Sequence, residues 1–200
     1  DAVPNLAGVV IASPSNPAGT VIPPDELKAI AETCHARGIR LISDEIYHGL
    51  VFDGRADTVA RYSPSAVVIN SFSKYFSMTG WRIGWMVGPE ELINHADNLG
   101  LAMLYGVPPF IQEAAFDALT ASRHEISGML EIYRKRRDLV SGLLTKATNA
   151  HVLIPEAGMF VLLDIAETGM TANEFARRLY GSENVSALDG AASGEPAASC

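Results

Sequence analysis

Three short apolar runs, rich in Val and Ile, constrain this chain most, because each one ends directly in a cluster of polar residues. They span residues 8–12, 39–43 and 66–70. Runs of this length and composition are typical of parallel strands covered on both faces. The carboxyl ends of parallel strands share one edge of a sheet, which is where open α/β sheets bind their ligands. We therefore expect the polar clusters to lie together.

A helix is predicted between the first two runs. Pro24 suits its first position, Leu27, Ala31 and Cys34 fall on one face, and Gly38 ends it. The order strand, helix, strand predicts a βαβ unit with parallel strands.

The remaining pattern predicts a fourth strand and a more helical second half. The expected elements are a strand at 82–87, helices at 109–120 and 124–146, a strand at 158–164, and a helix opened by a capping box at Thr171 and Glu174. On the helix at 124–146, the predicted apolar stripe includes Met129, Tyr133 and Val140.

The change of character near residue 145 predicts two units within an α/β fold. Residues 1–144 would form part of a mostly parallel sheet with flanking helices, including much of a long connecting helix. Residues 145–200 would form the incomplete start of a smaller α+β domain. The chain begins at Asp1 rather than Met and ends in a stretch with no strand or helix pattern. We interpret it as an interior piece of a longer protein.

Composition excludes several classes of partner. Lys and Arg number 15 against 23 Asp and Glu, giving a net charge of −8, so the chain has no basic footprint for nucleic acid or anionic lipid. Its two cysteines and five histidines show no metal-ligand spacing. We see neither a signal peptide nor a membrane span, and we expect a cytoplasmic protein.

Lysine is the most informative residue type, since the chain has only four. Three fall on polar faces of expected helices, where a surface charge is the ordinary role. Lys74 is different, because it is the only charged residue between Arg61 and Arg82. Such a lysine either reaches solvent or belongs to a site that uses it. A desolvated lysine becomes nucleophilic, as Schiff-base chemistry requires.

Polar residues after the first two runs are also candidates. Asp44 and Glu45 follow the second run, so we expect one of them to point into the crevice; the alternative role is a helix N-cap or a surface ion pair. Tyr47, three residues after Asp44, is placed to project the same way. Asn16 lies in the Pro-rich turn after the first run, which it could simply stabilise.

A candidate phosphate site follows the third run. Ser71 and Ser73 supply two hydroxyls, and Arg82 supplies a cation able to make paired hydrogen bonds. Together with Lys74 they place a nucleophile beside an anion site.

Three stretches resemble the signature blocks of class I/II aminotransferases, which are fold-type-I enzymes that use pyridoxal 5′-phosphate. They are SPSNPAGT at 13–20, SDEIY at 43–47, and SFSK at 71–74 followed by GWRIG at 80–84. The blocks occur in the family's order and approximate spacing, and the resemblance covers nearly the whole chain.

The resemblance implies a role for each candidate. Lys74 would form the Schiff base with the cofactor and then carry the substrate proton. Asp44 would pair with the pyridinium nitrogen, and Tyr47 and Asn16 would hydrogen-bond the ring oxygen.

Ser71, Ser73 and Arg82 would hold the phosphate. The partners implied are an amino acid, a 2-oxo acid and a second copy of the chain in a homodimer.

Parts of the family pattern are missing. The Gly-rich phosphate loop and the aromatic that stacks on the pyridine ring have no counterpart here, and the arginine that grips the substrate carboxylate would fall beyond Cys200. Ser193 stands where an aromatic is common. We expect the 200 residues alone to be inactive.

Two alternatives remain open at this point. One is another reaction on the same scaffold, such as a β-lyase, a decarboxylase or a cyclopropane synthase, because cofactor-binding blocks do not separate these. The other is the aminotransferase-like sensor domain of a transcription regulator. A Rossmann dehydrogenase is disfavoured, since no G-x-G-x-x-G follows a strand.

Overall fold

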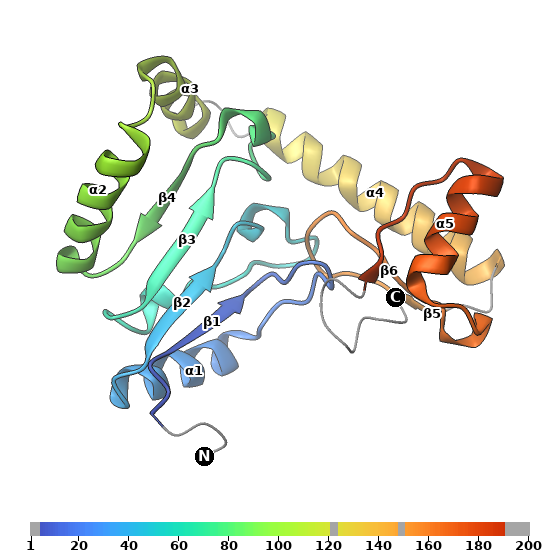
Figure 1. The fold of residues 1–200 in the computed structure, drawn as a ribbon, viewed down its shortest axis with the longest axis horizontal. Coiled ribbons are helices and arrows are strands. Elements are labelled where there is room, and N and C mark those ends of the chain that lie inside the picture. The colour runs from blue at the N-terminus through green and yellow to red at the C-terminus, as the bar shows by residue number, and fades with distance from the viewer. Residues whose placement is uncertain (1–4, 121–123, 148–150, 191–200) are drawn as a thin grey trace.

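A four-stranded sheet is the centre of the fold in the computed structural model, which describes residues 5–120, 124–147 and 151–190. The strands β1 (Gly8–Ala12), β2 (Arg40–Asp44), β3 (Val67–Ser71) and β4 (Gly84–Val87) lie in the order β1-β2-β3-β4. The pairs β1–β2 and β2–β3 are parallel, and β3–β4 is antiparallel (Figure 1). The mostly parallel sheet and its βαβ unit are as predicted, with strand boundaries within two residues.

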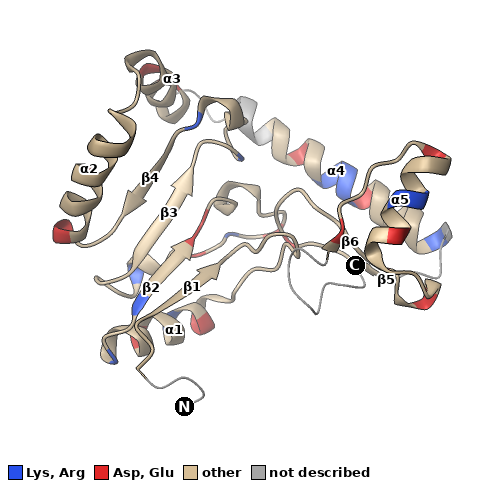
Figure 2. Cartoon of the chain, in the orientation of Figure 1, with Lys and Arg blue, Asp and Glu red and all other residues tan. Residues whose placement is uncertain are grey.

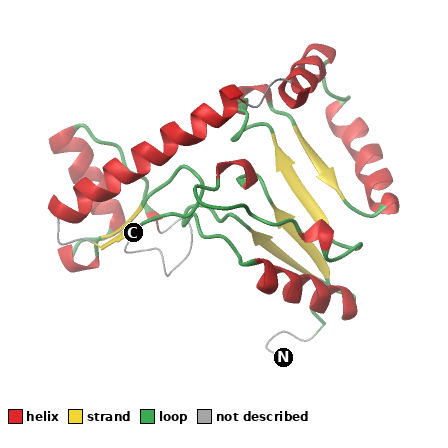
Figure 3. Cartoon of the chain, turned by 180° about the vertical axis from the view of Figure 1, so that it is seen from behind, coloured by secondary structure: helices red, strands yellow, loops and turns green. Residues whose placement is uncertain are grey.

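One edge of the sheet collects the segments of interest. In register, Ala12 is opposite Asp44, and Asp44 is opposite Ile69. Because β4 runs the other way, its first residue, Gly84, is opposite Ser71. The ends of β1, β2 and β3 and the start of β4 therefore meet at this edge, which we call the carboxyl edge. The loops gather there when the sheet is seen from behind (Figure 3).

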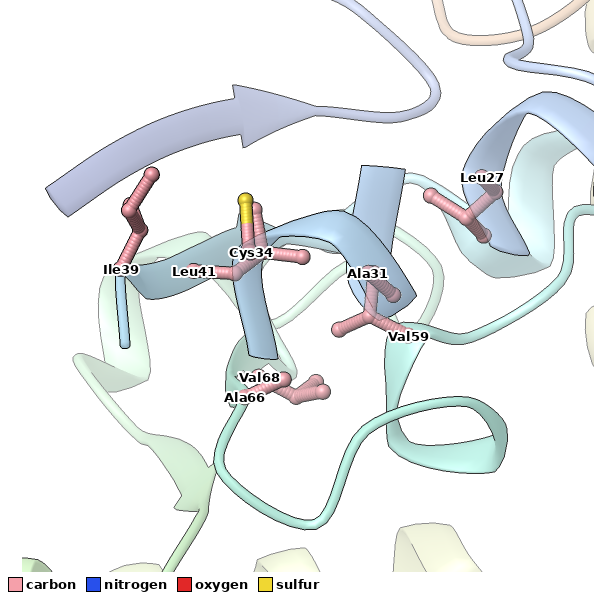
Figure 4. Close-up of a cluster of buried hydrophobic side chains, with 8 residues drawn as sticks. All are labelled: Leu27, Ala31, Cys34, Ile39, Leu41, Val59, Ala66 and Val68. Atoms are coloured by element: carbon pink, nitrogen blue, oxygen red, sulfur yellow. The ribbon is translucent and has the colours of Figure 1, made fainter. Parts of the chain in front are cut away.

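Helix α1 (Pro24–Ala36) supplies the main core. Its predicted apolar face is buried, with Leu27 at 1% exposure, Ala31 at 0% and Cys34 at 6%. These side chains meet residues from β2, β3 and the loop between them, namely Ile39, Leu41, Val59, Ala66 and Val68 (Figure 4). Burying a leucine of this kind stabilises a fold by roughly 1.5–3 kcal/mol. Gly38 ends the helix at a φ of +66°.

Three further helices follow β4: α2 (Glu90–Leu104), α3 (Pro109–Thr120) and α4 (His124–Ala147). The bounds of α3 and α4 agree with the sequence prediction, but α2 was not predicted. No residue of α2 is buried, and Ala115 is the buried residue of α3. Neither helix contains Lys or Arg, whereas charges of both signs lie along α4 (Figure 2).

The long helix α4 runs from the carboxyl edge to a second, smaller sheet (Figure 1). The predicted stripe on α4 is wrong at Val140, which is 42% exposed. Arg137 and Ser141 lie inside instead, at 13% and 3% exposure. The Arg137 guanidinium stacks over the Phe52 ring at 4.4 Å, so a charged residue takes the inner position.

The smaller sheet pairs β5 (His151–Leu153) and β6 (Leu162–Asp164) antiparallel, and α5 (Ala172–Glu183) follows. The capping box is confirmed in its first half, since Thr171 Oγ1 accepts from Glu174 N at 3.2 Å. The predicted strand at 158–164 is wrong over its first four residues. Gly158 has a φ of +85°, and the preceding Ala157 forms a bridge with Val51 instead.

The proposed division near residue 145 stays a prediction, and residues 191–200, with Ser193, lie outside the described residues. In the part of the chain that the structure describes, no helix is long and apolar enough to cross a membrane.

Candidate active site

The carboxyl edge brings together all the segments that carry predicted site residues. Asn16 lies in the turn after β1. Asp44 ends β2, and Tyr47 follows shortly after it. Ser71 ends β3, Ser73 and Lys74 come directly after it, and Arg82 precedes β4. The seven residues thus come from four neighbouring strand ends.

The turn at residues 13–20, which we call the asparagine turn, is fixed to the sheet by hydrogen bonds. Ser13 N donates to Asp44 O at 3.1 Å, and Ser13 Oγ accepts from Ile22 N at 3.0 Å. Within the turn, Ser15 Oγ accepts from Thr20 N at 3.1 Å. Ser13 is buried while Asn16 is exposed, so the turn has a fixed base and presents its asparagine outward.

The adjacent acids Asp44 and Glu45 have different environments. Glu45 is 2% exposed, and its Oε1 accepts from Val59 N at 3.0 Å and Thr58 Oγ1 at 3.1 Å. Its Oε2 lies 3.4 Å from His48 Nδ1. Asp44 is half-buried, and among the residues that the structure describes its carboxylate accepts only the local hydrogen bond from Ile46 N, at 3.1 Å. The Glu45 carboxylate is therefore committed to the fold, which favours Asp44 for the ligand.

Tyr47 is 2% exposed, and its hydroxyl is buried without a hydrogen-bond partner among the described residues. Burial raises the pKa of Tyr47, and the nearby Asp44 charge raises it further. The phenol therefore stays protonated as a hydrogen-bond donor at neutral pH. A buried hydroxyl without a partner is costly, and such a group calls for an acceptor.

The two serines after β3 form a compact hydroxyl pair. Ser73 N donates to Ser71 Oγ at 2.9 Å, and Ser71 Oγ donates to Ile83 O at 3.0 Å. The two hydroxyl oxygens are 2.9 Å apart. This network holds both hydroxyls at the end of β3, next to the segment that carries Arg82.

Arg82 was predicted to open the fourth strand, and this is wrong. It ends the short 3₁₀ helix at Thr79–Trp81 in a left-handed conformation, with a φ of +53°. Its Nη1 donates to Thr79 O at 3.0 Å, and Thr79 Oγ1 donates to Ser73 O at 2.6 Å. The guanidinium is thereby tied through Thr79 to the serine pair while it stays exposed.

Lys74 is half-buried, and its side chain makes no ion pair or hydrogen bond within the described ranges. It follows the serine pair directly in sequence, after the end of β3, the strand that neighbours the one ending in Asp44. A cavity of about 430 Å³ beside this edge is lined by Asn70 and Ser71 but by neither Asp44 nor Lys74. This cavity is therefore next to the candidate site and not the site itself.

This donor set fits pyridoxal 5′-phosphate. The unpartnered Tyr47 hydroxyl suits a ring oxygen, Asp44 suits a protonated ring nitrogen, and the serine pair suits a phosphate. Sequence reasoning missed one contributor, the segment at residues 155–158, which contacts the asparagine turn. No local pattern marks it, since its hydrogen bonds span more than a hundred residues of sequence.

Comparison with known proteins points the same way. The sequence profile of the family "Aminotransferase class I and II" matches residues 2–198. The arginine–pyruvate transaminase of Pseudomonas aeruginosa is 45% identical over 198 residues, covering 98% of this chain and 50% of that protein. The valine–pyruvate aminotransferase of Mycobacterium tuberculosis is 40% identical over 190 residues, covering 94% of this chain and 49% of that protein. This chain spans about half the length of the curated relatives it matches.

Solved structures share the fold. An aminotransferase from Mycobacterium tuberculosis has a TM-score of 0.85 at 42% identity, over 94% of this chain and 49% of that one. The aromatic aminotransferase from Pyrococcus horikoshii has a TM-score of 0.89 at 29% identity, over 94% of this chain and 52% of that one.

Proposed function

The chain belongs to the class I and II aminotransferases, and from this we propose that the whole protein moves an amino group from an amino acid to a 2-oxo acid. The observation that carries the proposal is the carboxyl edge itself, where a lone amine, a strand-end acid, an unpartnered buried phenol and a hydroxyl pair meet. The family depends on pyridoxal phosphate, which when bound supplies an electron sink for the amino acid's α-carbon.

Two groups of residues would hold the cofactor. The ring side consists of Asn16, Asp44 and Tyr47. The Asp44 carboxylate would keep a proton on the ring nitrogen, and the Tyr47 hydroxyl and Asn16 amide would donate to the ring oxygen. Glu45 would not take part directly, because its oxygens already serve Thr58, Val59 and His48.

The phosphate side consists of Ser71, Ser73 and Arg82. Here two hydroxyls and a guanidinium would share the phosphate oxygens, as charge-assisted hydrogen bonds favour. Lys74 directly follows Ser73, after the strand that neighbours β2. Its Nζ would hold the cofactor at the aldehyde carbon until the substrate's amine replaces it there, and the freed amine would take up and return the proton of the substrate's α-carbon.

A homodimer is part of the same proposal. Helices α2 and α3 expose several large apolar side chains, which are Leu101 at 63%, Leu104 at 72%, Tyr105 at 91% and Phe110 at 68%. Apolar exposure of this extent is typical of a surface that another polypeptide covers.

The test is an assay of the whole protein with pyridoxal phosphate. Arginine, valine and aspartate would be offered as amino donors, with pyruvate as the first acceptor because both relatives described above are named for it. We expect a stoichiometric amount of alanine to form. Release of ammonia or carbon dioxide without alanine would identify a lyase or a decarboxylase instead. Binding of the cofactor without turnover of any donor would favour a sensor domain.

A further inference from the structure

Residues 155–158, between β5 and β6, contact the two loops that carry the ring side, and we call them the clamp. The first contact is with the asparagine turn. The amides of Glu156 and Ala157 both donate to Gly19 O, at 3.0 and 2.9 Å. Glu156 Oε2 accepts from Val21 N at 2.9 Å. Three hydrogen bonds thus join the clamp to the turn that carries Asn16.

The second contact is with the loop after Tyr47. Phe52 N donates to Glu156 O at 2.9 Å, and Gly158 N donates to Leu50 O at 2.9 Å. Gly158 also faces the ring of Tyr47, since a β-carbon built there would lie 3.9 Å from Tyr47 Cδ1. The clamp therefore bonds on one side to the asparagine turn and on the other to the loop of the buried phenol.

Gly19 permits this close approach. Its φ is +69°, and a β-carbon at this position would lie 2.4 Å from both Ala157 O and Pro155 Cβ. A side chain at 19 would push the turn away from the clamp. Gly38 has a matching φ of +66° but nothing within 4 Å of its β-carbon position. The chain thus supplies its own control, with the same backbone conformation and no neighbour.

A third contact connects the clamp to α4. Arg137 Nη1 donates to Pro155 O at 3.3 Å, and its guanidinium covers the Phe52 ring. The clamp is therefore held by a partly buried arginine of the long helix as well as by the two loops, and Ala157 is fully buried. A segment fixed at three points can set the distance between the loops on either side of it.

We propose that the clamp fixes the asparagine turn relative to Tyr47, and that Gly19 and Glu156 are positioning residues of the cofactor site. Asn16 and Tyr47 belong to separate loops, and the clamp bonds to both. When it is displaced, the two donors no longer converge on one ring oxygen. This inference rests on the proposed function, because the ring oxygen is that of pyridoxal phosphate.

The experiment compares Gly19→Ala with Gly38→Ala in the whole protein, freed of cofactor and titrated with pyridoxal phosphate. Two readouts are the dissociation constant and the pH at which the visible absorbance of the bound cofactor changes. Gly19→Ala should weaken binding about tenfold or more. It should also raise that pH, because lost hydrogen bonds no longer favour the ionised ring oxygen. Gly38→Ala should leave both readouts at wild-type values.

A second pair of variants covers the case in which Gly19→Ala does not fold. Glu156→Ala removes the acceptor for Val21 N and should raise the same pH, whereas Glu156→Gln keeps an oxygen there and should restore it. A general loss of stability would not move this pH. The inference is overturned if wild type binds and both Gly19→Ala and Glu156→Ala titrate like Gly38→Ala. If wild type itself binds no pyridoxal phosphate, the proposed function is wrong, and the inference is wrong as well because it rests on that function.

Discussion

The ring side and the phosphate side of the candidate site differ in how their polar groups are satisfied. On the ring side, the Tyr47 hydroxyl is buried without a hydrogen-bond partner among the described residues, and Asp44 accepts a local hydrogen bond from Ile46 N. On the phosphate side, Ser71 and Ser73 bond to each other and to the backbone, and Arg82 is tied to Thr79.

This difference in hydrogen bonding shows how each side is prepared for a ligand. The ring side is held by burial and by neighbouring segments, so its polar groups are left available at some cost in stability. The phosphate side is organised by its own hydrogen bonds, with Ser73 buried at 8% exposure and Arg82 exposed. Changes on the ring side should therefore affect proton chemistry as well as affinity, and changes on the phosphate side should affect affinity alone.

The largest effect is expected at the end of β2, where Asp44 and Glu45 are adjacent but should respond differently to substitution. Asp44→Ala should lower kcat by about 10²–10³-fold, since a charge that stabilises the reacting state is removed. Glu45→Gln should leave kcat within about tenfold and instead lower the free energy of unfolding by about 1–3 kcal/mol, because a buried network is disturbed. Kinetics and denaturant unfolding of both variants decide this. Reversed sensitivities would assign the ring nitrogen to Glu45.

An intermediate effect is expected on the phosphate side. Arg82→Lys keeps the charge but loses the paired donors, so pyridoxal phosphate should bind about 10–100-fold more weakly with kcat at saturation little changed. The matched control is Arg178→Lys. Arg178 lies on α5, away from the carboxyl edge, and its guanidinium forms an ion pair with Glu174 at 2.8 Å. Equilibrium titration with cofactor measures both. Equal affinities for the two variants would remove Arg82 from the phosphate site.

The smallest effect is expected at Tyr47, where one substitution should raise the stability of the protein and lower its affinity for the cofactor. Tyr47→Phe removes a buried hydroxyl without a partner, so the cofactor-free protein should gain roughly 1 kcal/mol of stability. Cofactor binding should weaken a few-fold, about the value of one hydrogen bond. Because the folded pKa of Tyr47 is raised, wild type should also lose stability relative to the variant as the pH rises above about 10, where the unfolded phenol ionises first. A variant less stable than wild type at pH 7 would show that the hydroxyl has a structural partner.

Much of this arrangement follows from local sequence, and the exceptions have physical reasons. The helix at Pro24–Ala36 was predicted because its cap, its apolar face and its terminal glycine agree. The helix at Glu90–Leu104 has only a partly buried stripe, at Leu92, Ile93 and Ala96, and its last turn exposes apolar residues, so its apolar residues do not keep to one face. Gly158 and Arg82 were placed in strands, but both have a positive φ, which ends an extended strand.

In the candidate site, too, some features follow from local sequence and others depend on how the chain folds. The seven residues were predicted from motifs, and the common edge followed from the parallel order of β1, β2 and β3. Without the resemblance, which assigns the ring nitrogen to Asp44, local sequence does not separate Asp44 from Glu45. The difference between them depends on Thr58 and Val59, which reach Glu45 only after the chain folds back. The clamp was missed for the same reason.

Attachment of the cofactor to Lys74 is the central claim, and it can be measured directly. The whole protein, loaded with pyridoxal phosphate, would be reduced with borohydride and digested, and the labelled peptide would be identified by mass spectrometry. We predict that the label falls on Lys74 alone and that Lys74→Ala loses both the label and the visible absorbance of the bound cofactor. A label on Lys28, Lys135 or Lys146, or a Lys74→Ala variant that keeps label and absorbance, would contradict the claim.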